Sequence, residues 1–167
     1  MSASIPELQA LTTTLASPLD AVAWLSKTKD LIVLCPQSRS GLRGALYEAG
    51  PAVRLPYEAT TDADLGLALL TALGQFRLQQ RDLRGDPVPW HSFIASGVKS
   101  QSDFSRHFLA AQVTLSPSSL SVEVLPEGVF GIGVIAHLGL PDPPTLGRKV
   151  FHAYYCCRSL QEQGLLT

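Results

Sequence analysis

One helical pattern occurs twice in this sequence, and it constrains the fold more than any other feature. The segment Thr61–Arg77 (TDADLGLALLTALGQFR) aligns without a gap with Asp142–Arg158 (DPPTLGRKVFHAYYCCR). Identical residues stand at Leu65 and Leu146, Gly66 and Gly147, Ala72 and Ala153, and Arg77 and Arg158. In each segment apolar residues recur at i, i+4, i+7, i+8 and i+11, which is the stripe of an amphipathic helix. The sequence therefore predicts two similar helices that each lay one face on the core.

The two predicted helices also begin alike. Thr61 and Asp142 precede them, and either side chain can accept a hydrogen bond from the free amides of a first helical turn. Pro143 then occupies the first helical position, where a missing N–H costs nothing. A glycine inside a helix costs about 1 kcal/mol relative to alanine. Gly66 and Gly147 therefore predict points where a neighbouring element comes too close for a side chain.

Strand patterns precede both helices. Apolar residues alternate in 53–57 before the first helix and in 134–138 before the second, and a period of two indicates a half-buried strand. Further runs with strand character are Asp30–Pro36, Leu42–Glu48 and Gln112–Pro126, the last interrupted by a turn at its Ser-Pro-Ser-Ser step. Short turns between such runs favour antiparallel pairing.

The predicted fold class is α+β, an internally duplicated unit of antiparallel strands followed by a helix. The two pseudo-repeats span about residues 30–79 and 111–162 of a single domain, 1–167. A connecting segment, 80–110, joins them and is rich in glycine, proline and polar residues. We expect that segment to be irregular and to be the natural place for a binding loop.

One or two short helices are expected before the first repeat. Ser17, followed by Pro18, has the character of a helix cap. The helix that it would begin carries the apolar residues Val22, Trp24 and Leu25.

Composition limits the function classes. Hydrophobic residues make up 46% of the chain and charged residues 16%, which is typical of a globular protein and not of a disordered one. The formal net charge of −1 leaves no surplus of cations for a phosphate backbone, so nucleic-acid binding is disfavoured. The first residues lack the pattern of a signal peptide, and no run approaches the roughly 18 apolar residues of a membrane span. Three cysteines do not make a disulfide framework. We therefore expect a cytoplasmic protein.

Neither a metal site nor an enzyme is supported by the residues. His152 and Cys156 stand four positions apart and would share a helix face, as zinc ligands can. However, Cys157 aligns with Phe76 and is expected in the core, and no second ligand pair has a recognised spacing. Cys35 ends an apolar strand without a motif that would activate it. The prediction is no catalytic residue, no metal and no cofactor.

Two other motifs have both a functional and a structural interpretation. Ser38–Gly44 (SRSGLRG) could cradle an anion with its backbone amides, but it lacks the full phosphate-loop spacing and is more simply a turn. Trp90, Phe93 and Phe104 stand among basic residues in the connecting segment and could stack on bases. The structural alternative is that these rings anchor a long segment to the core.

Several motifs of the chain form a recognisable combination. The helical pattern reads LGxxLLxALxxFR and then LGxxVFxAYxxCR, and Ser40–Leu42 (SGL) precedes the segment LPYEATTDADLG. Trp90 lies in the middle region, and the second helix ends near Cys157. From about Val33 to Arg158 this combination resembles the immunity proteins of contact-dependent growth inhibition systems. The DPPTLG of the second copy departs from the family, which tends to have an acidic residue before LG.

The resemblance implies a small bacterial protein without enzymatic activity. Such an immunity protein binds the cognate toxin C-terminal domain delivered by a neighbouring cell, commonly a nuclease, and blocks its active site in the cytoplasm. Some immunity proteins of such systems are also similar to the plant Whirly domain, a strand-rich unit plus helix written twice. Single-stranded nucleic-acid binding is therefore the alternative function.

An inhibitor of a nuclease faces a basic cleft, so it is expected to offer carboxylates that steer the encounter and fix its register. The candidate toxin-binding residues outside the helix stripes are Glu48, Asp86, Asp103, Glu123 and Glu127. Each of them could also be an ordinary solvated charge.

Overall fold

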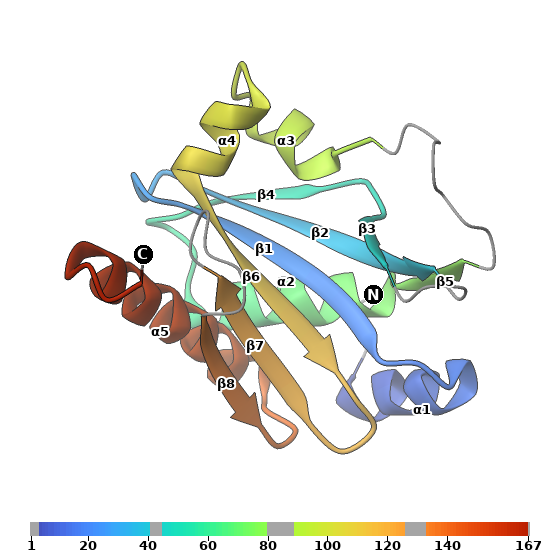
Figure 1. The fold of residues 1–167 in the computed structure, drawn as a ribbon. Helices are drawn as coiled ribbons and strands as arrows, with labels where there is room; N and C mark the ends of the chain where they lie inside the picture. Colours follow the sequence, from blue (N-terminus) through green and yellow to red (C-terminus); the bar gives the residue numbers. More distant parts are fainter. Residues whose placement is uncertain (1–3, 41–44, 80–88, 126–132, 167) are drawn as a thin grey trace.

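The computed structural model describes residues 4–40, 45–79, 89–125 and 133–166 of the 167-residue chain (Figure 1). Its helices are α1 (Ile5–Leu15), α2 (Asp62–Gly74), α3 (His91–Ser96), α4 (Gln101–His107) and α5 (Pro143–Glu162). Its strands are β1 (Leu19–Ser26), β2 (Leu31–Ser40), β3 (Leu46–Glu48), β4 (Val53–Pro56), β5 (Arg77–Gln79), β6 (Phe108–Leu115), β7 (Leu120–Leu125) and β8 (Val134–Leu138). The predicted α+β class is confirmed.

In the described part of the chain all strands belong to one sheet. The hydrogen-bonded order is β3-β2-β1-β6-β7-β8, and both β4 and β5 also pair with β2. The pairs are antiparallel apart from β2 with β5, which is parallel. β1 and β6 lie at the centre, where Ala23 is opposite Ala111. The predicted antiparallel pairing is confirmed, with β5 as a short parallel addition.

Helices α2 and α5 cover the same face of the sheet (Figure 1). α2 packs on β1 and β2, and α5 packs on β7 and β8. The apolar stripes predicted from the repeat form the core, since Leu65, Leu69, Leu73, Leu146 and Val150 are all fully buried. Among the described residues, no helix has the length and hydropathy that crossing a bilayer requires.

The two repeated glycines lie where α2 and α5 touch. A Cβ atom added to Gly66 would lie 1.8 Å from the carbonyl oxygen of Pro143, in the first turn of α5. A Cβ atom added to Gly147 would lie 1.9 Å from the carbonyl oxygen of Asp62, in the first turn of α2. Each helix therefore places the start of the other against its own glycine, and the predicted close approach is confirmed at both positions.

The predicted caps are also confirmed. The hydroxyl of Thr61 accepts a hydrogen bond from the amide of Asp64 at 3.2 Å. The carboxylate of Asp142 accepts one from the amide of Thr145 at 2.8 Å. This hydrogen bonding favours the ionised carboxylate and lowers the pKa of Asp142 below its ordinary value of 3.8.

Acid is therefore expected to weaken the start of α5. Because the pKa of Asp142 is lower in the folded state, its charge stabilises the fold above about pH 4, and that stabilisation is lost as the pH falls through the folded-state pKa. Asp142→Asn keeps a capping oxygen but loses the charge, so its free energy of unfolding should fall less steeply with acid than that of the wild type. Urea unfolding from pH 5 to pH 2.5 measures this, and parallel curves for the two proteins would contradict it.

The prediction of a helix at Val22–Leu25 is wrong, because these residues lie in β1 at the centre of the sheet. The segment is covered on both faces, and nearly every residue of β1 is buried. A strand buried on both faces shows no alternation, so a short apolar run is easily confused with a helix. The expected amino-terminal helix is α1, where the amide of Ser4 donates to the Glu7 carboxylate at 2.7 Å.

The connecting segment is more regular than expected, since α3 and α4 lie within it. Gly97 ends α3 in the left-handed conformation, with φ of 75°. The hydroxyl of Ser100 begins α4 by accepting a hydrogen bond from the amide of Asp103 at 3.1 Å. The second run of strands begins at Phe108, three residues before the predicted limit at 111. Residues 80–88 of the segment lie outside the described part of the chain.

Candidate functional site

The face of the sheet opposite α2 and α5 is named here the outer face. Its polar residues are Asp20, Gln37, Arg39, Gln112, Thr114, Ser121, Glu123 and His137. Burial alternates along β6 and β7, so Val113, Val122 and Val124 point to the helices while the residues between them point away. The outer face is therefore one surface on which this chain could meet a partner.

Hydrogen bonds within the protein fix much of the outer face. The carboxylate of Asp20 is fully buried and accepts hydrogen bonds from Nη2 of Arg39 at 2.7 Å and from Oγ1 of Thr114 at 2.8 Å. The side-chain amide of Gln112 donates to Oε1 of Gln37 at 2.6 Å. A buried carboxylate is tolerated only with such partners. Asp20 and Arg39 therefore serve mainly to hold β1, β2 and β6 together.

Helices α3 and α4 dock on one end of the outer face through an aromatic cluster. Its members are Trp24, Trp90, Phe93, Phe104 and Phe108. The ring of Phe104 is fully buried, and its centroid lies 4.9 Å from that of Trp24, 5.1 Å from Trp90 and 4.7 Å from Phe108. The structural interpretation of the aromatic residues is confirmed, because they attach the connecting segment to the sheet. A buried ring such as Phe104 is not available to stack on a base.

Glu48, the first candidate toxin-binding residue, is directed into the protein. Its carboxylate accepts hydrogen bonds from Nε1 of Trp24 at 3.0 Å and from the amide of Ser92 at 2.8 Å. The Ser92 hydroxyl donates to the same carboxylate. The side chain thus ties the first turn of α3 to β1 and β3, and these bonds account for Glu48 without a partner protein.

Glu48→Gln is expected to lower the free energy of unfolding by about 1–2 kcal/mol, because one buried donor loses its acceptor. The Trp24 indole donates to one carboxylate oxygen and the Ser92 amide to the other, and in glutamine one of these two positions is an NH₂ group that cannot accept. Urea unfolding followed by tryptophan fluorescence measures the loss. Glu123→Gln, on a partly exposed strand residue, is the control and should stay within about 0.5 kcal/mol of the wild type. Equal stability of the two variants would contradict this role of Glu48.

Of the other acidic candidates, two lie within the described residues, and both are on elements other than β3, which carries Glu48. Asp103 lies in α4, where it accepts from the Ser100 hydroxyl at 2.7 Å and lies 3.7 Å from Nη1 of Arg106. Glu123 lies on β7, opposite Gln112 and beside the exposed β8. Asp86 and Glu127 lie outside the described residues. A toxin-binding role for these carboxylates stays a prediction.

Cys35 and Cys157 have the environment of core residues. Burial and the nearby Glu48 carboxylate raise the pKa of the Cys35 thiol to about 12, and burial also raises the pKa of Cys157. A thiol is a nucleophile only as the thiolate, so neither group is activated. Cys156 and His152 are exposed on α5. Among residues 4–40, 45–79, 89–125 and 133–166, no group of three or more His, Cys, Asp or Glu could hold a metal ion.

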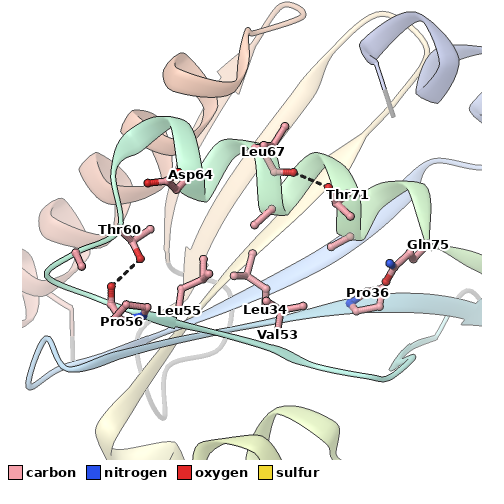
Figure 2. Close-up of a pocket in the computed structure, with 13 residues that line it drawn as sticks. Leu34, Pro36, Val53, Leu55, Pro56, Thr60, Asp64, Leu67, Thr71 and Gln75 are labelled. Atoms are coloured by element: carbon pink, nitrogen blue, oxygen red, sulfur yellow. Dashed lines mark hydrogen bonds between the residues drawn. The ribbon is translucent and has the colours of Figure 1, made fainter. Parts of the chain in front are cut away.

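A hollow of about 490 Å³ lies between α2 and the edge of the sheet at β4; we call it the α2–β4 groove (Figure 2). The sheet contributes Leu34, Pro36, Val53, Leu55 and Pro56, the turn before α2 contributes Ala59 and Thr60, and α2 contributes Asp64, Leu67, Ala68, Thr71, Ala72 and Gln75. Most of the lining is apolar, and Val53 and Leu67 remain 48% and 46% exposed. An exposed hollow of this composition is typical of a binding site.

The α2–β4 groove was not predicted from the sequence. Its residues come from β2, β4 and one side of α2, so no contiguous motif marks it. The available signal was the repeat alignment itself, in which Leu67 and Ala68 stand where α5 has Arg148 and Lys149. At these positions α2 has apolar residues on its solvent side, whereas α5 has cations. Packing in the core does not explain such apolar residues, so they indicate an apolar surface.

Comparison with known proteins identifies the fold. No family model and no curated protein matches the chain. Among solved structures, a protein of unknown function from Neisseria meningitidis, NMB0488, matches with a TM-score of 0.67 and 16% identity over 85% of this chain and 96% of that one. A chain of the CdiA-CT/CdiI toxin and immunity complex from Yersinia pseudotuberculosis matches with a TM-score of 0.64 and 11% identity over 84% of this chain and 98% of that one. The protein therefore shares its fold, over nearly their full length, with these two bacterial chains.

Proposed function

We propose that this protein is an immunity protein that binds and neutralises the toxin domain of a contact-dependent growth inhibition system. The observation that carries the proposal is the fold shared with a chain of the CdiA-CT/CdiI complex. The resemblance to contact-dependent growth inhibition immunity proteins rests on separate evidence, namely the repeated LG helices of the sequence and the motifs around them. The two lines of evidence support one function.

In this role the protein acts by occlusion and not by chemistry. The raised pKa values of Cys35 and Cys157 support this, since neither thiol is prepared for nucleophilic attack. The small net charge of −1 is also compatible with a partner that carries a basic active site. The place of action would be the cytoplasm, where a delivered nuclease reaches its substrate.

The proposal is tested with the toxin domain encoded beside the gene of this protein. Co-expression should yield a complex that survives size-exclusion chromatography, and the purified protein should abolish the activity of the toxin with nanomolar affinity. The same preparation offered single-stranded DNA at low salt should show no retention, which separates this function from a Whirly-like one. A neighbourhood without a toxin gene, or a toxin domain that stays active with the protein in excess, would refute the proposal.

We also propose that the two halves of the chain are an internal duplication. The supporting observations are the aligned helices, the reciprocal contacts of Gly66 and Gly147, and the strand order, which runs outwards from β1 through β2 to β4 and from β6 through β7 to β8. Such an arrangement gives the protein two similar helix–strand edges. Their side chains differ, so one edge can be specialised for a partner.

A further inference from the structure

The α2–β4 groove runs along α2 beside its buried stripe, from which Ala72 contributes to the lining. Figure 2 shows Asp64 and Thr60 towards one end and Gln75 and Pro36 towards the other, with Leu67 between them. The lining residues of α2 span about three helical turns, so the groove is roughly 16 Å long. That length accommodates several side chains of a partner segment rather than one small group.

The corresponding edge of the second half has the opposite character. Leu67 and Ala68 of α2 align with Arg148 and Lys149 of α5, which are both exposed. Exposed helix positions are ordinarily occupied by polar residues, as they are in α5. Leu67 and Ala68 of α2 depart from this rule at the positions where α5 follows it. Both residues line the α2–β4 groove.

The groove also has a charge at one end. Asp64 is the one charged residue of its lining, and no cation lines it among the described residues. Hydrogen bonds from the hydroxyl and amide of Thr61 lower the pKa of Asp64, so its carboxylate stays ionised at neutral pH. An apolar hollow that ends in a carboxylate favours an apolar occupant with a cationic group and disfavours an anionic one, such as a fatty acid.

We propose that the α2–β4 groove is the docking surface for a segment of the toxin that inserts apolar side chains beside Leu67 and Val53 and places a lysine or arginine near Asp64. This inference rests on the proposed function, because it names the surface by which the toxin is held. Among the described acidic candidates from the sequence, none lines this groove. The apolar floor supplies affinity, and the carboxylate sets the direction of the segment.

The chemistry of the groove is tested without the toxin, by titrating the ¹⁵N-labelled full-length protein with tryptamine and with indole-3-acetate. The two probes share a ring and carry opposite charges. Amide shifts should map to Val53, Leu67 and Thr71, and tryptamine should bind about two- to fivefold more tightly, which is the preference that one exposed ion pair supplies. Asp64→Asn should remove this preference. Shifts that map elsewhere, or an equal or reversed preference, would overturn the proposal.

The docking role is tested with Leu67→Arg, which puts into the groove the residue that α5 carries at the matched position. Arginine is a good helix former, so the variant should keep the wild-type unfolding curve. Its affinity for the neighbouring toxin domain should fall by about tenfold or more, because the guanidinium would replace an apolar contact and, three residues from Asp64 on the same helix, would compete with the cation of the toxin for that carboxylate. Ile94→Arg is the control, since Ile94 is 65% exposed on α3 outside the groove.

The outcomes separate this inference from the proposed function. If the wild type binds the toxin and Leu67→Arg binds it equally well, the groove is not the docking surface although the protein is an immunity protein. If the wild type itself fails to bind, the proposed function fails and the inference fails with it. Loss of binding in Leu67→Arg with binding retained in Ile94→Arg supports both.

Discussion

Replacing Gly147 with alanine is expected to lower the free energy of unfolding by about 3 kcal/mol. A Cβ atom at this position would lie 1.9 Å from the carbonyl oxygen of Asp62. That oxygen belongs to the backbone, so it cannot move away by a change of rotamer as a flexible side chain can. In a helix without such a contact the same change would stabilise the protein by about 1 kcal/mol. The sign of the measured effect therefore reports directly on the close approach of α2 and α5.

Urea unfolding measures the effect, and two further variants make it specific. Gly66→Ala meets the carbonyl oxygen of Pro143 at 1.8 Å and should cost as much as Gly147→Ala. The double variant should cost less than the sum, because helices already forced apart accommodate the second methyl group. Gly139→Ala is the control, since no atom lies within 4 Å of its added Cβ, and it should stay within about 0.5 kcal/mol of the wild type. A Gly147→Ala variant more stable than the wild type would contradict the contact.

Features that depend on neighbours in sequence could be predicted. The stripe that includes Leu65 and Leu69 fixed the buried face of α2, and the capping residues Thr61 and Asp142 fixed where α2 and α5 begin. A glycine that recurs at the same helical step predicted a close contact. It could not name the contacting atoms, because the first turn of the opposite helix is distant in sequence.

The error at β1 has a different cause. On one face α2 covers Leu19–Ser26, and on the other face Arg39 and the aromatic cluster cover it. Its sequence therefore shows neither the period of a helix nor that of a half-buried strand. Ser17 and Pro18 then suggested a helix start where the chain instead enters the centre of the sheet. Such a segment is decided by tertiary packing, which a local pattern does not contain.

The candidate site was the least predictable part. The sequence does not show whether a glutamate is solvated or points into the protein. Glu48 points inwards because the amide and hydroxyl of Ser92 donate to it. Ser92 lies in α3, a helix that the sequence did not predict. The α2–β4 groove has the same difficulty, because Leu34, Val53 and Leu67 meet only after the sheet and α2 have formed. Both features are properties of the assembled fold.

Replacing Phe104 with alanine is expected to lower the free energy of unfolding by about 3–5 kcal/mol, the usual cost of removing a fully buried ring. The ring lies between Trp24 of β1, Trp90 before α3 and Phe108 of β6. The cavity left behind would open the contact by which α3 and α4 are attached to the outer face. Phe104→Leu keeps most of the volume and should cost much less, about 1 kcal/mol.

Tryptophan fluorescence gives this prediction a local readout, because the two tryptophans of the chain, Trp24 and Trp90, both belong to the aromatic cluster. If α3 and α4 detach before the sheet unfolds, the fluorescence of Phe104→Ala changes at a lower urea concentration than its far-ultraviolet circular dichroism. In the wild type the two transitions should coincide, since the cluster and the main core share β1, β2 and β6. A wild-type urea midpoint in Phe104→Ala would show that the ring is not the attachment of α3 and α4.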